Sequence, residues 1–232
     1  MTSQGLAWAR PPERLVCDSP HVHVWRAELD GLTADVQTLG QTLERDERER
    51  AERFWTSEDR RRYIVGRAVL RTVLARYLNC KAEHLRFSRG PYGKPLLAGP
   101  RTSHGLRFSV SHAGGLALYS VSRARETGVD LERVRDDLPT RRLAERSFSP
   151  RTLALLSNLS PQQFAEGFFA CWTRREAYLK ARGCGFAHGW QHGLDEEAGW
   201  LLEDLRPGPG YVGALAVEGK SYQLHCWEWS PH

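Results

Sequence analysis

Two long segments with a helical hydrophobic period constrain the fold of this chain more than any other feature. Residues 58–78 place apolar side chains near a 3.6-residue period, and Ser57 with the two acidic residues after it suits a helix N-terminus. Residues 161–182 show a second helical pattern. Because strand-like segments lie between and after them, both halves of the chain are expected to mix helices with strands.

The strand-like segments show short runs of alternating or continuous apolar residues. Residues 21–25 (HVHVW) alternate, which predicts a half-buried strand with His21 and His23 on its solvent-facing side. Turn residues around 123–127 suggest the seam between the halves and an antiparallel sheet on either side of it. An exposed helix is expected over 41–53, and further strands at 106–110, 116–122, 128–132, 211–217 and 222–229.

The charge of the chain narrows the class of partner. Its composition is that of an ordinary folded protein, with 41% hydrophobic and 26% charged residues. The net charge is +5, and many arginines fall between residues 45 and 76. Such a surface suits nucleic acid, a phosphate-rich cofactor or an acidic protein, and it equally suits a solvated charged helix. Charge alone does not choose among them.

Cysteine usage and hydropathy bear on the compartment. The five cysteines are odd in number and show no CxxC or Cys/His metal-ligand spacing, which favours a reduced, cytoplasmic protein. The N-terminal residues have no apolar signal-peptide core, and no uncharged apolar run approaches the roughly 20 residues that span a bilayer. We therefore expect neither export nor a membrane span.

Two patterns place charged side chains together. Asp130 and Glu132 are two residues apart on a predicted strand, so their carboxylates project from one face and suit a hard cation such as magnesium. Trp172, Glu176 and Lys180 are spaced four apart, on one face of a predicted helix. Taken alone, an exposed strand edge and a surface ion pair are the commoner explanations of these patterns.

Other residues point to phosphate binding without a known phosphate loop. The turn at 90–95 would present Lys94, and Ser111 and His112 precede a Gly-containing loop that can bring backbone N–H groups and an imidazole to a phosphate. The chain has no GxxxxGK[ST] or GxGxxG motif and no GxSxG nucleophile turn. Phosphate binding would thus rest on Arg, Lys, His and metal, and covalent hydrolase chemistry is not expected.

Four short motifs, in this order, resemble those of the Sfp-type (surfactin synthetase-activating) 4'-phosphopantetheinyl transferases. They are GKP at 93–95, FSVSH at 108–112, GVDLE at 128–132 and WTRREAYLK at 172–180. The resemblance covers roughly residues 45–190. It implies an α+β fold with two similar α/β halves, antiparallel sheets related by a pseudo-two-fold axis, and an active site in the cleft between them. Residues 1–123 would form the side that binds the coenzyme A nucleotide, and residues 124–232 the metal-binding and catalytic side.

The resemblance assigns the metal and catalytic residues. The carboxylates of Asp130, Glu132 and Glu176 would hold magnesium, or manganese in its place. Glu176, Lys180 and His112 would be catalytic, with Glu176 as the base or only a metal ligand.

It also assigns the residues that contact coenzyme A. Arg175 stands where the family usually has lysine, which keeps the charge and changes the geometry. The pyrophosphate would be contacted by Lys180, Ser111 and His112, and the nucleotide end by Lys94 and Arg86. Further contacts with coenzyme A would come from Arg175, Arg67 and Arg50.

The implied activity is that of a monomeric, holo-acyl-carrier-protein synthase type enzyme. It would move the phosphopantetheine arm of coenzyme A to a serine of an acidic apo acyl or peptidyl carrier protein, in fatty-acid, polyketide or nonribosomal peptide biosynthesis, and release adenosine 3',5'-bisphosphate. Two alternatives stay open. One is a catalytically silent scaffold that binds coenzyme A or a carrier protein, against which the intact acidic residues argue. The other is a basic nucleic-acid-binding module, for which no RNP, zinc-finger or helix-turn-helix signature appears.

Overall fold

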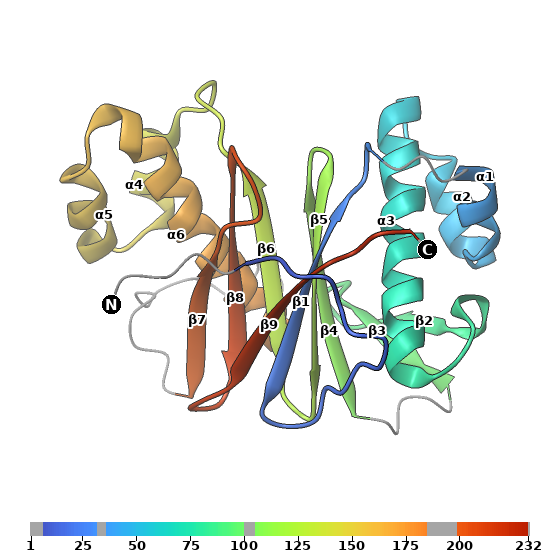
Figure 1. Ribbon diagram of the computed structural model, residues 1–232. Coiled ribbons are helices and arrows are strands. Elements are labelled where there is room, and N and C mark those ends of the chain that lie inside the picture. The colour runs from blue at the N-terminus through green and yellow to red at the C-terminus, as the bar shows by residue number, and fades with distance from the viewer. Residues whose placement is uncertain (1–6, 32–35, 100–104, 185–198, 232) are drawn as a thin grey trace.

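The computed structural model describes residues 7–31, 36–99, 105–184 and 199–231. Two sheets lie side by side, with α3 covering the first and α6 packed against the second (Figure 1). In chain order the elements are β1 (His21–Glu28), α1 (Val36–Gln41), α2 (Arg45–Ala51), α3 (Ser57–Leu78), the 3-10 helix η1 (Ala82–His84), β2 (Arg86–Arg89), β3 (Pro95–Ala98), β4 (Leu106–Ala113), β5 (Leu116–Arg123), β6 (Thr127–Arg133), α4 (Thr140–Ser147), α5 (Pro150–Ser157), α6 (Pro161–Arg182), β7 (Trp200–Leu205), β8 (Tyr211–Glu218) and β9 (Gln223–Glu228).

The strand order confirms the expected α+β class and antiparallel pairing, with one exception. The first sheet has the order β4-β5-β1-β9, the second has β6-β8-β7, and β2 and β3 form a separate hairpin. Strand β1 pairs antiparallel with β5 but parallel with β9. The last strand of the chain therefore completes the sheet that contains the first.

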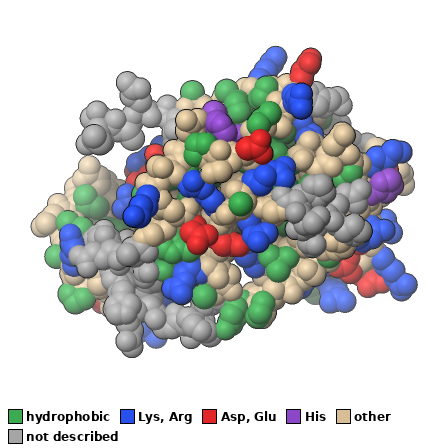
Figure 2. Space-filling view, turned by 90° about the horizontal axis from the view of Figure 1, so that it is seen from below, with side chains coloured by type: hydrophobic (Ala, Val, Ile, Leu, Met, Phe, Trp, Pro, Cys, Tyr) green, Lys and Arg blue, Asp and Glu red, His purple; other side chains and the backbone are tan. Residues whose placement is uncertain are grey.

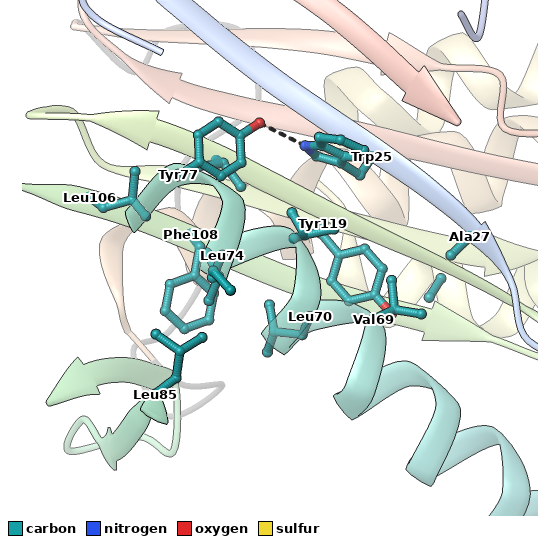
Figure 3. Packing of buried hydrophobic residues seen from close by; sticks show 14 of the residues in the cluster. Trp25, Ala27, Val69, Leu70, Leu74, Tyr77, Leu85, Leu106, Phe108 and Tyr119 are labelled. Carbon is teal, nitrogen blue, oxygen red and sulfur yellow. Dashed lines mark hydrogen bonds between the residues drawn. The ribbon is translucent and has the colours of Figure 1, made fainter. Parts of the chain in front are cut away.

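Helix α3 packs its apolar side against the first sheet. Thr56 caps its N-terminus by accepting a hydrogen bond from the Asp59 amide, and Asn79 ends it in the left-handed conformation. Figure 3 shows side chains of the helix, among them Leu70 and Leu74, packed against aromatic residues of the strands. The predicted helix over 58–78 is confirmed, and its cap lies one residue before the predicted Ser57.

Strand β1 is buried on both faces, which corrects one sequence prediction. Val22 and Val24 pack toward the second sheet, and Trp25 packs under α3. His23 is only 3% exposed, and its Nδ1 lies 2.7 Å from the Tyr77 hydroxyl. The prediction that His23 faces solvent is therefore wrong, because the C-terminal turn of α3 covers that face of the strand.

Helix α6 and strand β6 approach each other unusually closely. A Cβ atom on Gly128 would lie 2.0 Å from the carbonyl oxygen of Ala177 and 2.4 Å from the amide nitrogen of Ala181. Small side chains of α6 and β8 line the same contact. Only glycine fits at position 128, and the close contact brings the side chains of β6 within reach of those of α6.

Candidate functional site

The site lies where β4, β6 and α6 meet. The Lys180 ammonium donates to Asp130 Oδ1 at 2.6 Å and to Ser111 Oγ at 2.9 Å. The Ser111 hydroxyl also donates to Asp130 Oδ1, at 2.9 Å. Three predicted site residues, each from a different element, thus meet at one carboxylate oxygen.

The local structure explains why these side chains converge. Asp130 is 4% exposed and Glu132 is half-buried on the same side of β6, as their two-residue spacing predicts. Glu176 is 7% exposed and lies one turn before Lys180 on α6. The close approach of β6 to α6 brings Asp130 into contact with Lys180 and leaves Glu132 and Glu176 within electrostatic range of both.

The gathered carboxylates affect each other's protonation. Burial, with the charge of Asp130 as a second cause, raises the pKa of Glu176 to about 7. Burial and the charge of Asp130 also raise the pKa of Glu132. At both glutamates, burial and the neighbouring Asp130 therefore disfavour the charged form.

Two buried carboxylate oxygens bear on whether a cation fits at this site. Among the described residues, Asp130 Oδ2 and Glu176 Oε1 are buried and accept no hydrogen bond. Such oxygens are costly to bury, and oxygen ligands are those that magnesium prefers. In the described parts of the chain, however, no group of three His, Cys, Asp or Glu side chains is arranged to hold a metal ion. The donor chemistry fits a hard cation, and the ligand set stays a prediction.

His112 follows Ser111 at the end of β4. The residue as a whole is exposed to solvent. The pKa of its imidazole is nevertheless lowered, mainly because the surrounding protein desolvates the ring and also because of the positive charges of Lys180 and Arg50. His112 therefore lies within electrostatic range of Lys180 and Arg50, and its ring is neutral near pH 7.

A pocket of about 260 Å³ adjoins this cluster. One wall is the turn that precedes β3, another is β4, and a third is the C-terminal end of α6. Sequence reasoning missed several of its residues, although Ser109 could have been found because it lies two residues before Ser111 on the same strand. The lining residues are Tyr92, Gly93, Lys94, Pro95, Ser109, Val110, Glu176, Leu179, Lys180, Gly183 and Cys184.

Two of the predicted arginines are held in an ion-pair network that the sequence did not reveal. Arg67 donates from Nε to Glu47 at 2.7 Å, and Arg86 lies 3.3 Å from Glu44. Between them the fully buried Arg71 pairs with both glutamates. These contacts tie the N-terminal end of α2 to α3 and to β2, and they engage Arg67 and Arg86 with glutamates.

Arg50 and Arg175 lie in different surroundings. The Arg50 guanidinium lies 5.6 Å from the Tyr63 ring centre and lines a second pocket of about 470 Å³, with Arg53 and Arg89. Arg175 donates to the Ser147 carbonyl at 3.3 Å, and burial lowers its pKa. The structure thus brings Ser111, Asp130, Glu176 and Lys180 together. The contacts described for the four predicted arginines are instead with Glu47, Glu44, Tyr63 and Ser147.

Much of the basic charge between residues 45 and 76 is paired within the protein. Arg45 pairs with Glu49, Arg62 with Asp30, and Arg60 with Glu52. Figure 2 shows one face of the molecule, where Lys and Arg side chains are dispersed and Asp and Glu side chains lie among them. Acidic partners therefore offset part of the basic charge of this segment.

Comparison with known proteins identifies the family of this chain. An N-terminal 4'-phosphopantetheinyl transferase family model matches residues 25–123, and a 4'-phosphopantetheinyl transferase superfamily model matches residues 126–222. The 4'-phosphopantetheinyl transferase HetI of Nostoc is 37% identical over 232 residues, covering 96% of this chain and 98% of that protein.

Two further relatives carry similar names. A putative 4'-phosphopantetheinyl transferase of Synechocystis is 34% identical over 179 residues, covering 77% of this chain and 71% of that protein. The transferase Sfp of Bacillus subtilis is 26% identical over 142 residues, covering 61% of each. This chain belongs to the 4'-phosphopantetheinyl transferase superfamily.

Proposed function

We propose that this protein transfers the phosphopantetheine arm of coenzyme A to a serine of an apo acyl or peptidyl carrier protein, releasing adenosine 3',5'-bisphosphate. The observation that carries the proposal is the cluster of Lys180, Ser111, Asp130 and Glu176, where segments from both matched regions meet. An ammonium, a hydroxyl and buried carboxylates can together bind a pyrophosphate and a cation.

Coenzyme A would lie in a cleft between the two matched regions. Its pyrophosphate would contact Lys180, Ser111 and His112, and its nucleotide end would enter the pocket beside the turn 90–95. Arg50 would add a phosphate contact from the neighbouring pocket. We further propose that the regions are related by a pseudo-two-fold axis, since each sheet is covered by one 22-residue helix.

Asp130, Glu132 and Glu176 would hold magnesium, or manganese in its place. When bound, the cation supplies charge neutralisation at the pyrophosphate. The oxygen of the carrier serine attacks the β-phosphorus, a new O–P bond forms, and the bond to the nucleotide phosphate breaks. Glu176 would accept the serine proton. Lys180 and His112 stabilise the departing phosphate, so that positioning and electrostatics supply most of the rate.

The partner would be a carrier protein that is acidic around its serine, since the net charge of +5 speeds the encounter with such a surface. This corresponds to a holo-acyl-carrier-protein synthase acting as a monomer in fatty-acid, polyketide or nonribosomal peptide synthesis. None of the helices in the described ranges is long and apolar enough to cross a membrane.

The test is to mix the protein with an apo carrier protein, coenzyme A and magnesium, and to follow the intact mass of the carrier with and without EDTA. We expect a gain of one phosphopantetheine arm that is lost with the chelator. Asp130→Ala and Glu176→Gln should each slow transfer by at least about a hundredfold while the protein stays folded. Coenzyme A binding without any mass gain across several carriers would instead favour the silent scaffold.

A further inference from the structure

We propose that Lys94 is a positioning residue that fixes the distance between the turn 90–95 and α6, and that Glu126 orients its ammonium group. The inference rests on the proposed function, because it takes coenzyme A as the ligand of the pocket between these two walls. It differs from a direct contact with the nucleotide end of coenzyme A, the role that resemblance alone gives to Lys94.

The contacts of Lys94 join the two matched regions. Its side chain is 13% exposed, and its Nζ donates to the carbonyl oxygens of Ala181 at 3.2 Å and Thr127 at 3.4 Å. The third acceptor is Glu126 Oε2, at 3.3 Å. An ammonium group has three hydrogens to donate, and these acceptors use all three. Lys94 therefore has no N–H to offer a phosphate while this arrangement holds.

The end of α6 is a favourable place for this ammonium. Ala181 lies in the last turn, where carbonyl groups have no partner within the helix and the helix dipole favours a cation. The Lys94 stem also lies against the helix end, since a Cβ on Gly183 would be 4.0 Å from Lys94 Cδ. The Lys94 side chain thus links the turn 90–95 to the C-terminal end of α6, which is the opposite wall of the pocket.

Glu126 is held in place from the side away from the pocket. Its Oε1 accepts a hydrogen bond from Arg107 Nε at 2.8 Å, and its amide donates to Glu218 at 3.1 Å. Glu126 is not among the residues that line the pocket. Because Glu126 contacts Lys94 and does not line this pocket, the pair is suitable for a double-mutant cycle.

The experiment measures the Kd for coenzyme A by calorimetry and kcat and KM by the carrier assay, for Lys94→Met, Glu126→Gln and the double variant. We expect about a tenfold rise in Kd and KM for Lys94→Met and about threefold for Glu126→Gln, with kcat within about twofold. The double variant should bind no more weakly than Lys94→Met. Lys220→Met, which removes one exposed lysine elsewhere, is the matched control and should leave Kd unchanged.

Two results would overturn the inference. Multiplicative effects in the double variant would mean that Lys94 binds the ligand independently of Glu126. A lower Tm with unchanged Kd and KM would mean that Lys94 serves only the stability of the fold. A wild-type protein that binds coenzyme A but transfers nothing would contradict the proposed function alone. In that case the Kd values of the wild type and the three variants would still test the role of Lys94. A wild type that binds no coenzyme A would overturn both.

Discussion

The Asp130 carboxylate shows what single residues contribute to this site. A carboxylate that is 4% exposed needs a compensating charge, and Lys180 supplies it at 2.6 Å. The spacing of Asp130 and Glu132 predicted that they share a face. It could not predict that Lys180 pairs with Asp130 rather than with Glu176, because that choice depends on how β6 crosses α6.

His23 carries a residue-scale prediction for stability. Burial, with the neighbouring His225 and His21, lowers the pKa of His23 from 6.5 to about 4. Between these values the unfolded chain binds a proton that the folded chain does not, so the free energy of unfolding decreases as the pH falls through this window. At pH 5 the loss relative to pH 7 should be about 2 kcal/mol from this residue.

Urea unfolding of the wild type and of His23→Gln at pH 7 and pH 5 measures this effect. The variant should be less stable at pH 7, because the contact with Tyr77 is altered, but should lose less stability on going to pH 5. An equal loss in both proteins would assign the acid sensitivity to other groups, of which His225 also has a lowered pKa.

At the scale of elements, the sequence predicted what local pattern determines. Helix α6 has the predicted bounds 161–182 and a capping box formed by Ser160 and Gln163. The eight-residue helices α4 and α5 were not predicted, since helices this short gain stability mainly from packing, here of Phe148 and Leu156 on α6. The expected helix over 41–53 is shorter, covering 45–51 as α2.

The contact of β6 with α6 carries the element-scale prediction. Gly128→Ala would place a methyl group against the backbone of α6, so the two elements must separate. We expect the free energy of unfolding to fall by about 1–3 kcal/mol. The rate of phosphopantetheine transfer should fall by a larger factor than the affinity for coenzyme A. Gly40→Ala is the control, since its nearest atom outside the helix backbone is 3.9 Å away. A Gly128→Ala protein with wild-type stability and rate would contradict the close packing.

At the scale of the whole molecule, the pairing of β9 determines whether the two halves can fold independently. The division at residues 123–124 stays a prediction, and β9 returns across it to pair with β1. Side chains of β1 also share a core with β6, in which Val22 and Val24 pack with Val129 and Leu131. A local pattern could indicate the strand at 222–229, but not its parallel partner some 200 residues earlier in the chain.

This topology predicts that neither half folds alone. A fragment of residues 1–123 lacks β9 and leaves the edge of β1 open, and a fragment of residues 124–232 leaves β9 without a neighbour. Neither fragment should show a cooperative thermal transition by circular dichroism, whereas an equimolar mixture should recover one, together with coenzyme A binding. A cooperative transition in the isolated 1–123 fragment would show that β4, β5, β1 and α3 form a self-sufficient unit. In that case β9 would join the halves without being needed to fold either, and the site between them could be assembled from parts that are each already folded.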